Sequence, residues 1–299
     1  MINTISFSGA SLKGCFHIGV AEELLNQGIR PTAISAVSYG SYVAPFQAIG
    51  DLPTAFINDA INTTQKQAFP KSPYSKWNVL TALIGKRNNI GDQIGALKIY
   101  SKHYTQAVHD KLKTLDTDVW IAVHEYKSRK VKHFNLKLVD RDTALKLIHA
   151  SASIPPFTKW VEIGGKYYCD PGITNHITSD WIVGKYNAPH LQGGDHLSVF
   201  SRPEIFDITK GEYIHDKNQP DNLPDNLGYI MNNMVLYTSI KDERLTNRAC
   251  KDLCIKHQKI HAPYKLLDQF YKFDPDLNRA FIELGKQQVE KWIDNYYIR

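Results

Sequence analysis

Short apolar runs and longer amphipathic stretches alternate along the first two thirds of the chain. The short runs are bounded by turn-forming residues, as buried strands are, and the stretches between them carry the spacing of helices. This alternation predicts a layered α/β fold. The predicted strands are residues 2–7, 33–37, 118–125, 131–138, 160–170 and 196–200, and the predicted helices are residues 14–27, 39–49, 53–66, 92–113 and 141–150.

The pattern changes after residues 216–226, which are polar and rich in proline, asparagine and aspartate. From there to the end of the chain, apolar residues recur at helical spacing. We therefore expect an α/β catalytic domain over residues 1–215 and a packed helical extension over residues 216–299. The predicted helices of the extension are residues 227–239, 241–260 and 275–297.

A serine, Ser38, stands where an apolar run ends and a helical stretch begins. A nucleophilic serine at such a turn needs small residues two positions before and after it, because the turn is tight. Ala36 and Gly40 occupy these positions, so A-V-S-Y-G departs from the pattern G-x-S-x-G at its first residue alone. The segment is typical of a nucleophile elbow, although a lone serine before a helix is more often an N-cap.

The chain begins with another strand, loop and helix, and its loop of small residues runs from Ser8 to Gly14. Such a loop presents backbone N–H groups at the positive end of a helix, which suits a phosphate or the oxyanion of acyl transfer. Its glycines stand at positions 9 and 14, so neither a G-x-G-x-x-G fingerprint nor a P-loop is present. The oxyanion is therefore favoured.

A third segment places an aspartate at the end of an apolar strand. The small-residue stretch 150–157 leads through a hairpin-like segment to Asp170, which is followed by Pro171 and Gly172. Asp-Pro-Gly holds its aspartate in a tight turn. Asp170 is therefore a candidate general base, although the tripeptide alone predicts only a turn.

Taken together, the three segments resemble the patatin-like phospholipase family. Its oxyanion loop, which ends in Arg/Lys-Gly, matches Gly9–Gly14, and its nucleophile motif matches Ala36–Gly40. Its small-residue stretch before Ile-Pro and its Asp-Gly motif match Ala150–Pro155 and Asp170–Gly172. The order and the spacing of the motifs agree over roughly the first two hundred residues.

This resemblance implies a three-layer sandwich around a central, mostly parallel sheet, with a Ser-Asp dyad that acts on ester bonds of membrane lipids. It makes Ser38 the nucleophile and Asp170 the base, within an elbow flanked by Ala36 and Gly40. The scheme needs no metal and no organic cofactor. The residues that it assigns to the oxyanion hole are Gly9, Ala10, Ser11, Lys13 and Gly14.

The resemblance therefore predicts a serine esterase of the phospholipase A type, which cleaves fatty acyl esters of phospholipids. The chain departs from the family pattern at Ala10-Ser11, Ala36 and Pro171. Two alternatives stay open: a catalytically silent lipid-binding or scaffold protein with the same fold, and an acyltransferase.

His17 and the cysteines do not require a further site. His17 shares a helix face with Val20 and Ala21, which favours packing. The four cysteines are too few and too scattered for a disulfide framework and suit a reducing compartment. Cys250, Cys254, His257 and His261 fall along one face of a predicted helix, but ligands strung along a straight helix cannot converge on one metal.

The chain carries a formal charge of +6, part of it in a predicted hairpin turn at residues 127–132. Basic residues attract anionic lipid by ~1 kcal/mol each near a membrane, although the turn could equally be a solvated surface. No nucleic-acid-binding module is recognisable. The apolar and aromatic residues between 72 and 95 fit either a lid over an acyl pocket or a helix packed on the core.

The chain shows no apolar run of 18 residues and no leader peptide. We therefore expect a soluble, cytoplasmic protein that can contact membranes peripherally. A protein delivered into another cell would have the same features.

Overall fold

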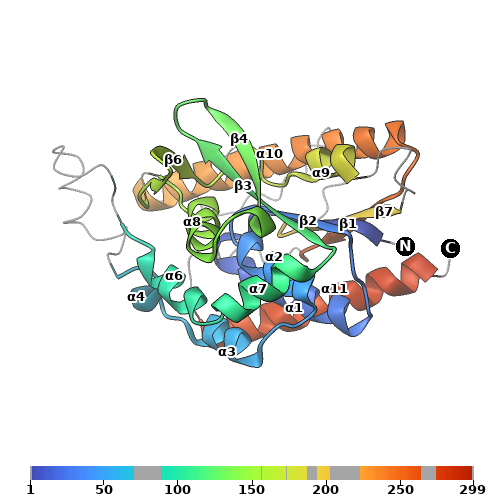
Figure 1. Cartoon of the computed structure of the whole chain (residues 1–299), viewed down its shortest axis with the longest axis horizontal. Helices are drawn as coiled ribbons and strands as arrows, with labels where there is room; N and C mark the ends of the chain where they lie inside the picture. The colour runs from blue at the N-terminus through green and yellow to red at the C-terminus, as the bar shows by residue number, and fades with distance from the viewer. Residues whose placement is uncertain are drawn as a thin grey trace.

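The apolar runs of the chain form a central eight-stranded sheet (Figure 1). The computed structural model describes residues 2–70, 89, 91–155, 157–172, 174–186, 194–202, 223–263 and 274–297. The strands are β1 (Ile2–Phe7), β2 (Ala33–Ala36), β3 (Asp118–Glu125), β4 (Lys130–Asn135), β5 (Val161–Ile163), β6 (Lys166–Cys169), β7 (Asp195–Phe200) and β8 (His257–His261).

The strands follow the order β5-β6-β3-β2-β1-β7-β8, and β4 pairs with β3 off this path. The pairs among β3, β2, β1, β7 and β8 are parallel, whereas β4 and β6 are antiparallel to β3 and β5 is antiparallel to β6. The predicted α/β class with a mostly parallel central sheet is therefore confirmed.

Helices cover both faces of this sheet (Figure 1). Two of them, α9 and α10, lie on one face, and α1, α2, α3, α7 and α11 lie on the other. The helices are α1 (Cys15–Asn26), α2 (Gly40–Ile49), α3 (Thr54–Asn62), α4 (Gln65–Ala68), α6 (Ile94–Ser101), α7 (Gln106–Thr114), α8 (Arg141–Ser151), α9 (Ser179–Tyr186), α10 (Leu223–Asp252) and α11 (Pro275–Tyr297). Short 3-10 turns η1 (Ser11–Gly14) and η2 (Leu136–Leu138) precede α1 and follow β4.

The innermost strands are buried on both faces because helices cover both sides. All four residues of β2 are buried, and so are five of the six residues of β1. Strands in such a sheet have no solvent-facing side, so their sequences are continuous runs of apolar and small residues. This is why the first two strands could be predicted within a residue of their ends.

The last helix, α11, is packed tightly on the first. A Cβ atom at Gly19 of α1 would lie 1.9 Å from the Ile282 carbonyl oxygen, and one at Gly285 of α11 would lie 2.4 Å from the Phe16 carbonyl oxygen. The two glycines therefore allow the backbones to approach closely. Helices α10 and α11 lie within residues 216–299, which also contain strand β8 of the central sheet.

Four predicted elements differ in their extent. The strand predicted at 160–170 is a hairpin, because Gly164 and Gly165 adopt φ of +57° and +74° and reverse the chain. The helix predicted at 92–113 is interrupted between α6 and α7, and the one predicted at 53–66 is α3 followed by the short α4. The strand predicted at 131–138 ends at Asn135 and continues as η2.

The prediction of a helix over residues 241–260 is wrong for the residues after Asp252. Helix α10 ends at Asp252, and Cys254 has φ of +55°, which is incompatible with a continued right-handed helix. The chain then forms β8, which pairs in parallel with β7 at the edge of the sheet. The sequence His-Gln-Lys-Ile-His is polar at an edge position, so it lacks the apolar run by which the other strands were predicted.

The proposed domain boundary falls in a part of the chain outside the described residues, which exclude 203–222. The division into 1–215 and 216–299 therefore stays a prediction. Most of the segment 72–95 also lies outside the described residues. In the part of the chain that the structure describes, no helix combines the length and the apolar character needed to span a bilayer.

Candidate active site

Ser38 lies at the turn that joins β2 to α2, in a backbone conformation that is unusual for serine. Its φ of +53° lies in the left-handed region, which costs a non-glycine residue roughly 1–3 kcal/mol. Two hydrogen bonds hold the turn: the Ser38 N–H donates to Ser151 Oγ at 2.9 Å, and the Val37 N–H donates to the Phe7 carbonyl at 3.1 Å. The strained turn places the buried serine at the end of the strand, where it lines a pocket, as in a nucleophile elbow.

The small residues around Ser38 are required by close packing on the first strand. A Cβ atom at Gly40 would lie 2.7 Å from Phe7 Cβ and 2.9 Å from its carbonyl oxygen. Ala36 is fully buried in β2, between Phe7 and Ile121 on the neighbouring strands. The turn is thus wedged between neighbours that leave no space for a larger side chain at position 40.

Asp170 follows β6 and lies beside Ser38, although 132 positions separate them in the sequence. The Ser38 side chain interacts with the Asp170 carboxyl group and favours its charged form. The Gly172 N–H donates to Asp170 Oδ1 at 2.7 Å, and the Asp170 N–H donates to the Ser153 carbonyl at 2.7 Å. The fold therefore brings together the two residues that the motifs predicted.

Burial raises the pKa of Asp170 to about 7 from the ordinary value of 3.8. The interaction with Ser38 and the hydrogen bond from the Gly172 N–H stabilise the charged form and act in the opposite direction. A carboxylate with this pKa is a stronger base than an exposed aspartate and is still about half ionised at neutral pH. Its protonation equilibrium is suited to general-base chemistry.

The loop of small residues after β1 passes directly over Ser38. A Cβ atom at Gly9 would lie 3.4 Å from Ser38 Cβ and 3.1 Å from the His176 ring. The Gly9 N–H donates to the His176 carbonyl at 2.9 Å, and the Lys13 N–H donates to the Ala10 carbonyl at 3.0 Å. These bonds give the loop a defined shape, with backbone close to the serine.

Gly14 ends this loop and permits its contact with the residue after the serine. A Cβ atom at Gly14 would lie 2.0 Å from the Tyr39 ring. Tyr39 in turn shares a hydrogen bond with Cys15, the first residue of α1. The two predicted motifs are therefore in direct contact, and the oxyanion loop and the elbow form one surface.

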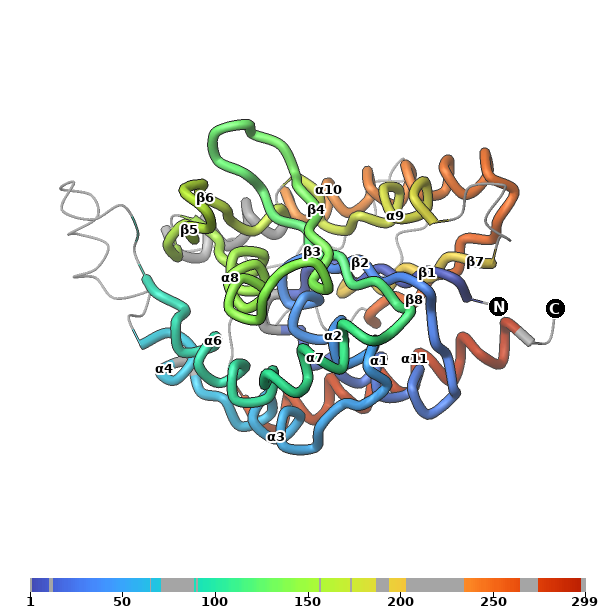
Figure 2. Tube along the Cα trace, in the orientation of Figure 1, coloured from blue at the N-terminus to red at the C-terminus, as the bar shows by residue number. Residues whose placement is uncertain are grey.

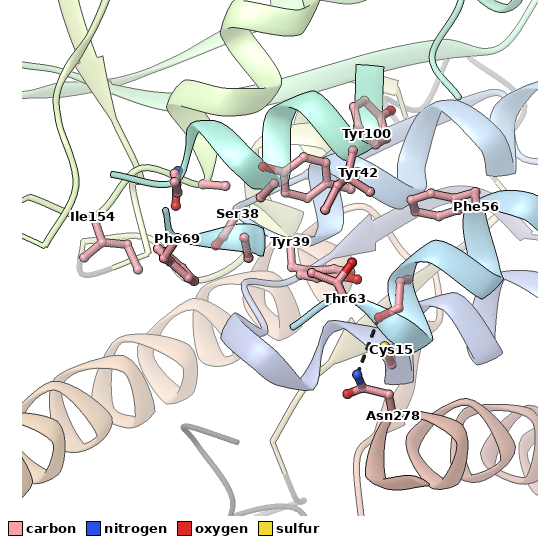
Figure 3. Close-up of a pocket in the computed structure, with 16 residues that line it drawn as sticks. Cys15, Ser38, Tyr39, Tyr42, Phe56, Thr63, Phe69, Tyr100, Ile154 and Asn278 are labelled. Carbon is pink, nitrogen blue, oxygen red and sulfur yellow. Dashed lines mark hydrogen bonds between the residues drawn. The ribbon is translucent and has the colours of Figure 1, made fainter. Parts of the chain in front are cut away.

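A largely apolar pocket of about 160 Å³ opens beside Ser38 (Figure 3). Aromatic rings form much of its wall: Tyr42 contacts Tyr100 with ring centroids 4.8 Å apart, and Phe56 contacts Tyr100 at 5.9 Å. Phe69 and Ile154 lie near the serine in the same view. The pocket offers a mainly hydrocarbon surface next to a hydroxyl group.

The C-terminal extension contributes to this pocket. Asn278 of α11 lines it and donates from its amide to the Ala60 carbonyl at 3.4 Å (Figure 3). The same amide also donates to the Ile61 carbonyl at 3.0 Å. Gln93 lines another part and donates to Ser153 Oγ at 2.9 Å. Neither residue was predicted from the sequence, because an isolated amide carries no motif.

Helix α10 holds the loop that follows Asp170. Asp242 of α10 accepts hydrogen bonds from the backbone N–H groups of His176 at 2.6 Å and Ile177 at 3.2 Å. Lys241 donates to the Thr174 carbonyl at 2.8 Å. The His176 peptide thus connects α10 to the Gly9 loop, and this connection has no signal in the sequence.

His17 is buried, as expected for a packing residue. Its ring contacts Phe7 in an edge arrangement, with centroids 5.6 Å apart, and both ring nitrogens are without a hydrogen-bond partner. Burial lowers its pKa to about 3, so the ring is neutral at physiological pH. The interaction partner of Asp170 is Ser38 and not this histidine.

The prediction that one helix carries Cys250, Cys254, His257 and His261 is wrong. Cys250 lies in α10, Cys254 in the turn after it, and the two histidines in β8. Among the described residues, no group of three or more histidine, cysteine, aspartate or glutamate side chains is arranged to hold a metal ion. The four cysteines are free thiols.

A buried carboxyl group beside a strained serine and an apolar pocket fits a hydrolase of lipid esters. The sequence of the chain agrees with this class. The family model described as patatin-like phospholipase matches residues 5–178, which is more than half of the chain. The chain therefore belongs to the patatin-like phospholipase family, a family of lipid hydrolases.

Two solved structures resemble this one over nearly the whole chain. VipD from Legionella pneumophila is 11% identical, with a TM-score of 0.44, and the match covers 98% of this chain and 67% of that one. The SpcU–ExoU complex from the type III secretion system of Pseudomonas aeruginosa contains a chain that is 13% identical, with a TM-score of 0.37; the match covers 97% of this chain and 52% of that one. No curated protein matches in sequence. At these sequence identities and TM-scores, the similarity to the two structures supports no conclusion about activity.

Proposed function

We propose that this protein is a phospholipase A-type acyl hydrolase, in which Ser38 and Asp170 form the catalytic dyad. The observation that carries the proposal is the interaction of the strained Ser38 with the buried Asp170 beside an apolar pocket. A serine hydroxyl alone is a weak nucleophile and needs a neighbouring base. Membership of the patatin-like phospholipase family supports a lipid ester as the substrate.

In the proposed reaction, Ser38 Oγ attacks the carbonyl carbon of a fatty acyl ester while Asp170 takes its proton. The tetrahedral intermediate then collapses, and Asp170 returns the proton to the departing alcohol of the lipid. The acyl group remains on Ser38 as an ester. Water attacks this ester with Asp170 again as the base, and the fatty acid and the free serine are released.

The oxyanion of each intermediate is stabilised by backbone N–H groups of the loop over Ser38. The N–H groups of Gly9 and Lys13 are already bonded within the protein, so Ala10 and Ser11 are the proposed donors. Their side chains do not remove the backbone donors, which is why the departure from glycine is compatible with activity. One such donor contributes about 3–4 kcal/mol to lowering the barrier.

The apolar pocket receives the acyl chain in this scheme. Its aromatic wall provides the hydrocarbon contact that an acyl chain needs, and Ser38 at its margin meets the carbonyl. Pockets that bind lipids and other small molecules are typically apolar with few polar groups. Neither a metal nor an organic cofactor takes part.

The experiment is labelling of Ser38 by a fluorescent fluorophosphonate, with release of fatty acid from mixed phospholipid vesicles measured in parallel. Ser38→Ala should abolish both signals, and Asp170→Asn should lose release and most labelling. Ser101→Ala and Asp294→Asn, which lie outside the site, are the matched controls. A folded wild type that binds vesicles but is neither labelled nor active would support the silent lipid-binding alternative. Labelling with acyl transfer to an added alcohol, but little release of fatty acid, would support an acyltransferase.

A further inference from the structure

Three aromatic side chains, which we call the aromatic cluster, gather where the β3–β4 turn meets the β5–β6 hairpin. They are Tyr126, Trp160 and Tyr167. Tyr126 lies opposite Tyr167, since its N–H donates to the Tyr167 carbonyl at 2.9 Å, and its ring centroid lies 5.0 Å from that of Trp160. Tyr126 is 61% exposed and Tyr167 is 49% exposed. Large rings so accessible to water on neighbouring strands indicate a contact surface.

Cationic residues flank the members of the aromatic cluster in the chain. Five of them are exposed, and we call them the basic rim: Lys127, Arg129, Lys130, Lys159 and Lys166.

Acidic side chains offset only part of this charge. Glu125 is buried and pairs with Lys166 at 3.5 Å. Segments 124–132 and 157–169, which contain the two hairpins, hold one other acidic residue, the exposed Glu162. The surface is therefore strongly positive around an apolar and aromatic centre. It is complementary to a surface that combines negative charge with hydrocarbon.

The cluster and rim lie at the same edge of the sheet as the candidate active site. Gly9 and Ser38 follow the carboxyl ends of parallel strands β1 and β2, and the β3–β4 turn follows the carboxyl end of β3. Because Ala36 pairs with Ile121, Tyr126 lies five positions farther along, which is about 16 Å at roughly 3.3 Å per residue. Figure 2 shows the β3–β4 turn and β5–β6 at the end of the molecule where α8 lies.

A short segment connects this surface to the pocket. Ile154 lines the pocket beside Ser38, and Lys159 and Trp160 follow five and six residues later. A lipid held at the cluster would therefore be near the pocket margin.

We propose that the β3–β4 and β5–β6 hairpin tips dock this protein on anionic lipid bilayers, with the aromatic cluster at headgroup level and the basic rim on the lipid phosphates. The inference rests on the proposed lipid hydrolase for its biological purpose, but its physical basis is independent. Tyrosine and tryptophan favour the membrane interface. Each lysine or arginine near an anionic surface strengthens binding about fivefold.

The test is co-flotation of the full chain with phosphatidylcholine vesicles, with and without phosphatidylserine. A triple variant, Lys127→Glu, Arg129→Glu and Lys130→Glu, should lose binding to the anionic vesicles by about a hundredfold or more. Its matched control, Arg244→Glu, Arg248→Glu and Lys291→Glu, makes the same change of charge on exposed helical positions and should retain most binding.

A second variant separates the aromatic contribution from the charge. Tyr126→Ser with Tyr167→Ser should weaken binding to both kinds of vesicle, whereas added salt should weaken wild-type binding only to the anionic ones. Both docking variants should be labelled by fluorophosphonate, and should hydrolyse a water-soluble short-chain ester, at the wild-type rate. This measurement also shows that they are folded.

Three results would overturn the docking surface: wild type that does not bind anionic vesicles, a rim variant that binds as the control does, or a control that loses binding equally. Rim-dependent binding by a protein that reacts with no ester would support the docking surface and refute the hydrolase. Reaction with esters together with rim-independent vesicle binding would support the hydrolase and refute the docking surface.

Discussion

In the proposed dyad, ionisation of Asp170 sets the pH at which Ser38 becomes reactive. Burial raises the pKa of Asp170 to about 7, against the interaction with Ser38 and the hydrogen bond from the Gly172 N–H. Only the carboxylate can accept the serine proton, so the labelling rate should rise about tenfold per pH unit below the pKa and level off above it. At about pH 5, about one site in a hundred is ionised, which predicts a rate about a hundredfold below the plateau.

The same pKa has a consequence for stability. The pKa in the folded state lies above the ordinary 3.8, so the stability contributed by Asp170 is fully present below about pH 4 and is lost as the pH rises towards about 7. A shift of this size corresponds to a cost on the order of 4 kcal/mol above pH 7, at 1.36 kcal/mol per unit. Asp170→Asn should remove most of this cost, so the inactive variant should unfold at a higher temperature than wild type at about pH 8.

The assay is the second-order rate of fluorophosphonate labelling from about pH 5 to about pH 8, corrected for the pH dependence of the reagent, together with thermal unfolding of both proteins. In the Asp170→Asn variant the slow residual labelling should not follow the wild-type rise. A wild-type profile that is flat, or that levels off near pH 4, would refute the raised pKa. An equal rise in the variant would assign the titration to another group.

Three further substitutions test how the site is built. Gly40→Ala should destabilise the protein by about 1–3 kcal/mol, because its Cβ would lie 2.7 Å from a Phe7 atom, and a lower midpoint in urea would show this. Asp242→Ala leaves two buried N–H groups of the aspartate loop without acceptors, so it should cost about 1–3 kcal/mol for each and slow labelling; Asp252→Ala, exposed at the end of the same helix, should do neither. Tyr100→Phe removes a buried hydroxyl that has no hydrogen-bond partner, so it should raise the unfolding temperature or leave it unchanged, and a clear decrease would contradict this.

The candidate site could be predicted because each of its parts is a local pattern. Ser38 with its small neighbours, the loop before α1 and the Asp-Pro-Gly turn are each encoded within a few residues. The inner strands were equally accessible, since β1 and β2 are buried on both faces and their residues are accordingly apolar or small. Patterns of this kind involve residues that are adjacent in the chain, so they can be recognised in the sequence alone.

Other features depended on residues far apart in the chain. Strand β8 forms because an open sheet edge beside β7 supplies its hydrogen bonds, although its own sequence is polar. Asp242 reaches the aspartate loop from α10, and Asn278 reaches the pocket from α11.

The sequence by itself determined the layered α/β class and the order of the three motifs, because backbone preference and burial leave a periodic record in adjacent residues. Tertiary structure alone decided that the Ser38 hydroxyl meets Asp170, that burial moves the pKa of this carboxyl group to about 7, and that the two hairpin tips lie together at the edge of the site. A pKa and a hydrogen bond between distant residues depend on the solvent that packing excludes and on the distance between groups, and neither quantity exists until the chain has folded.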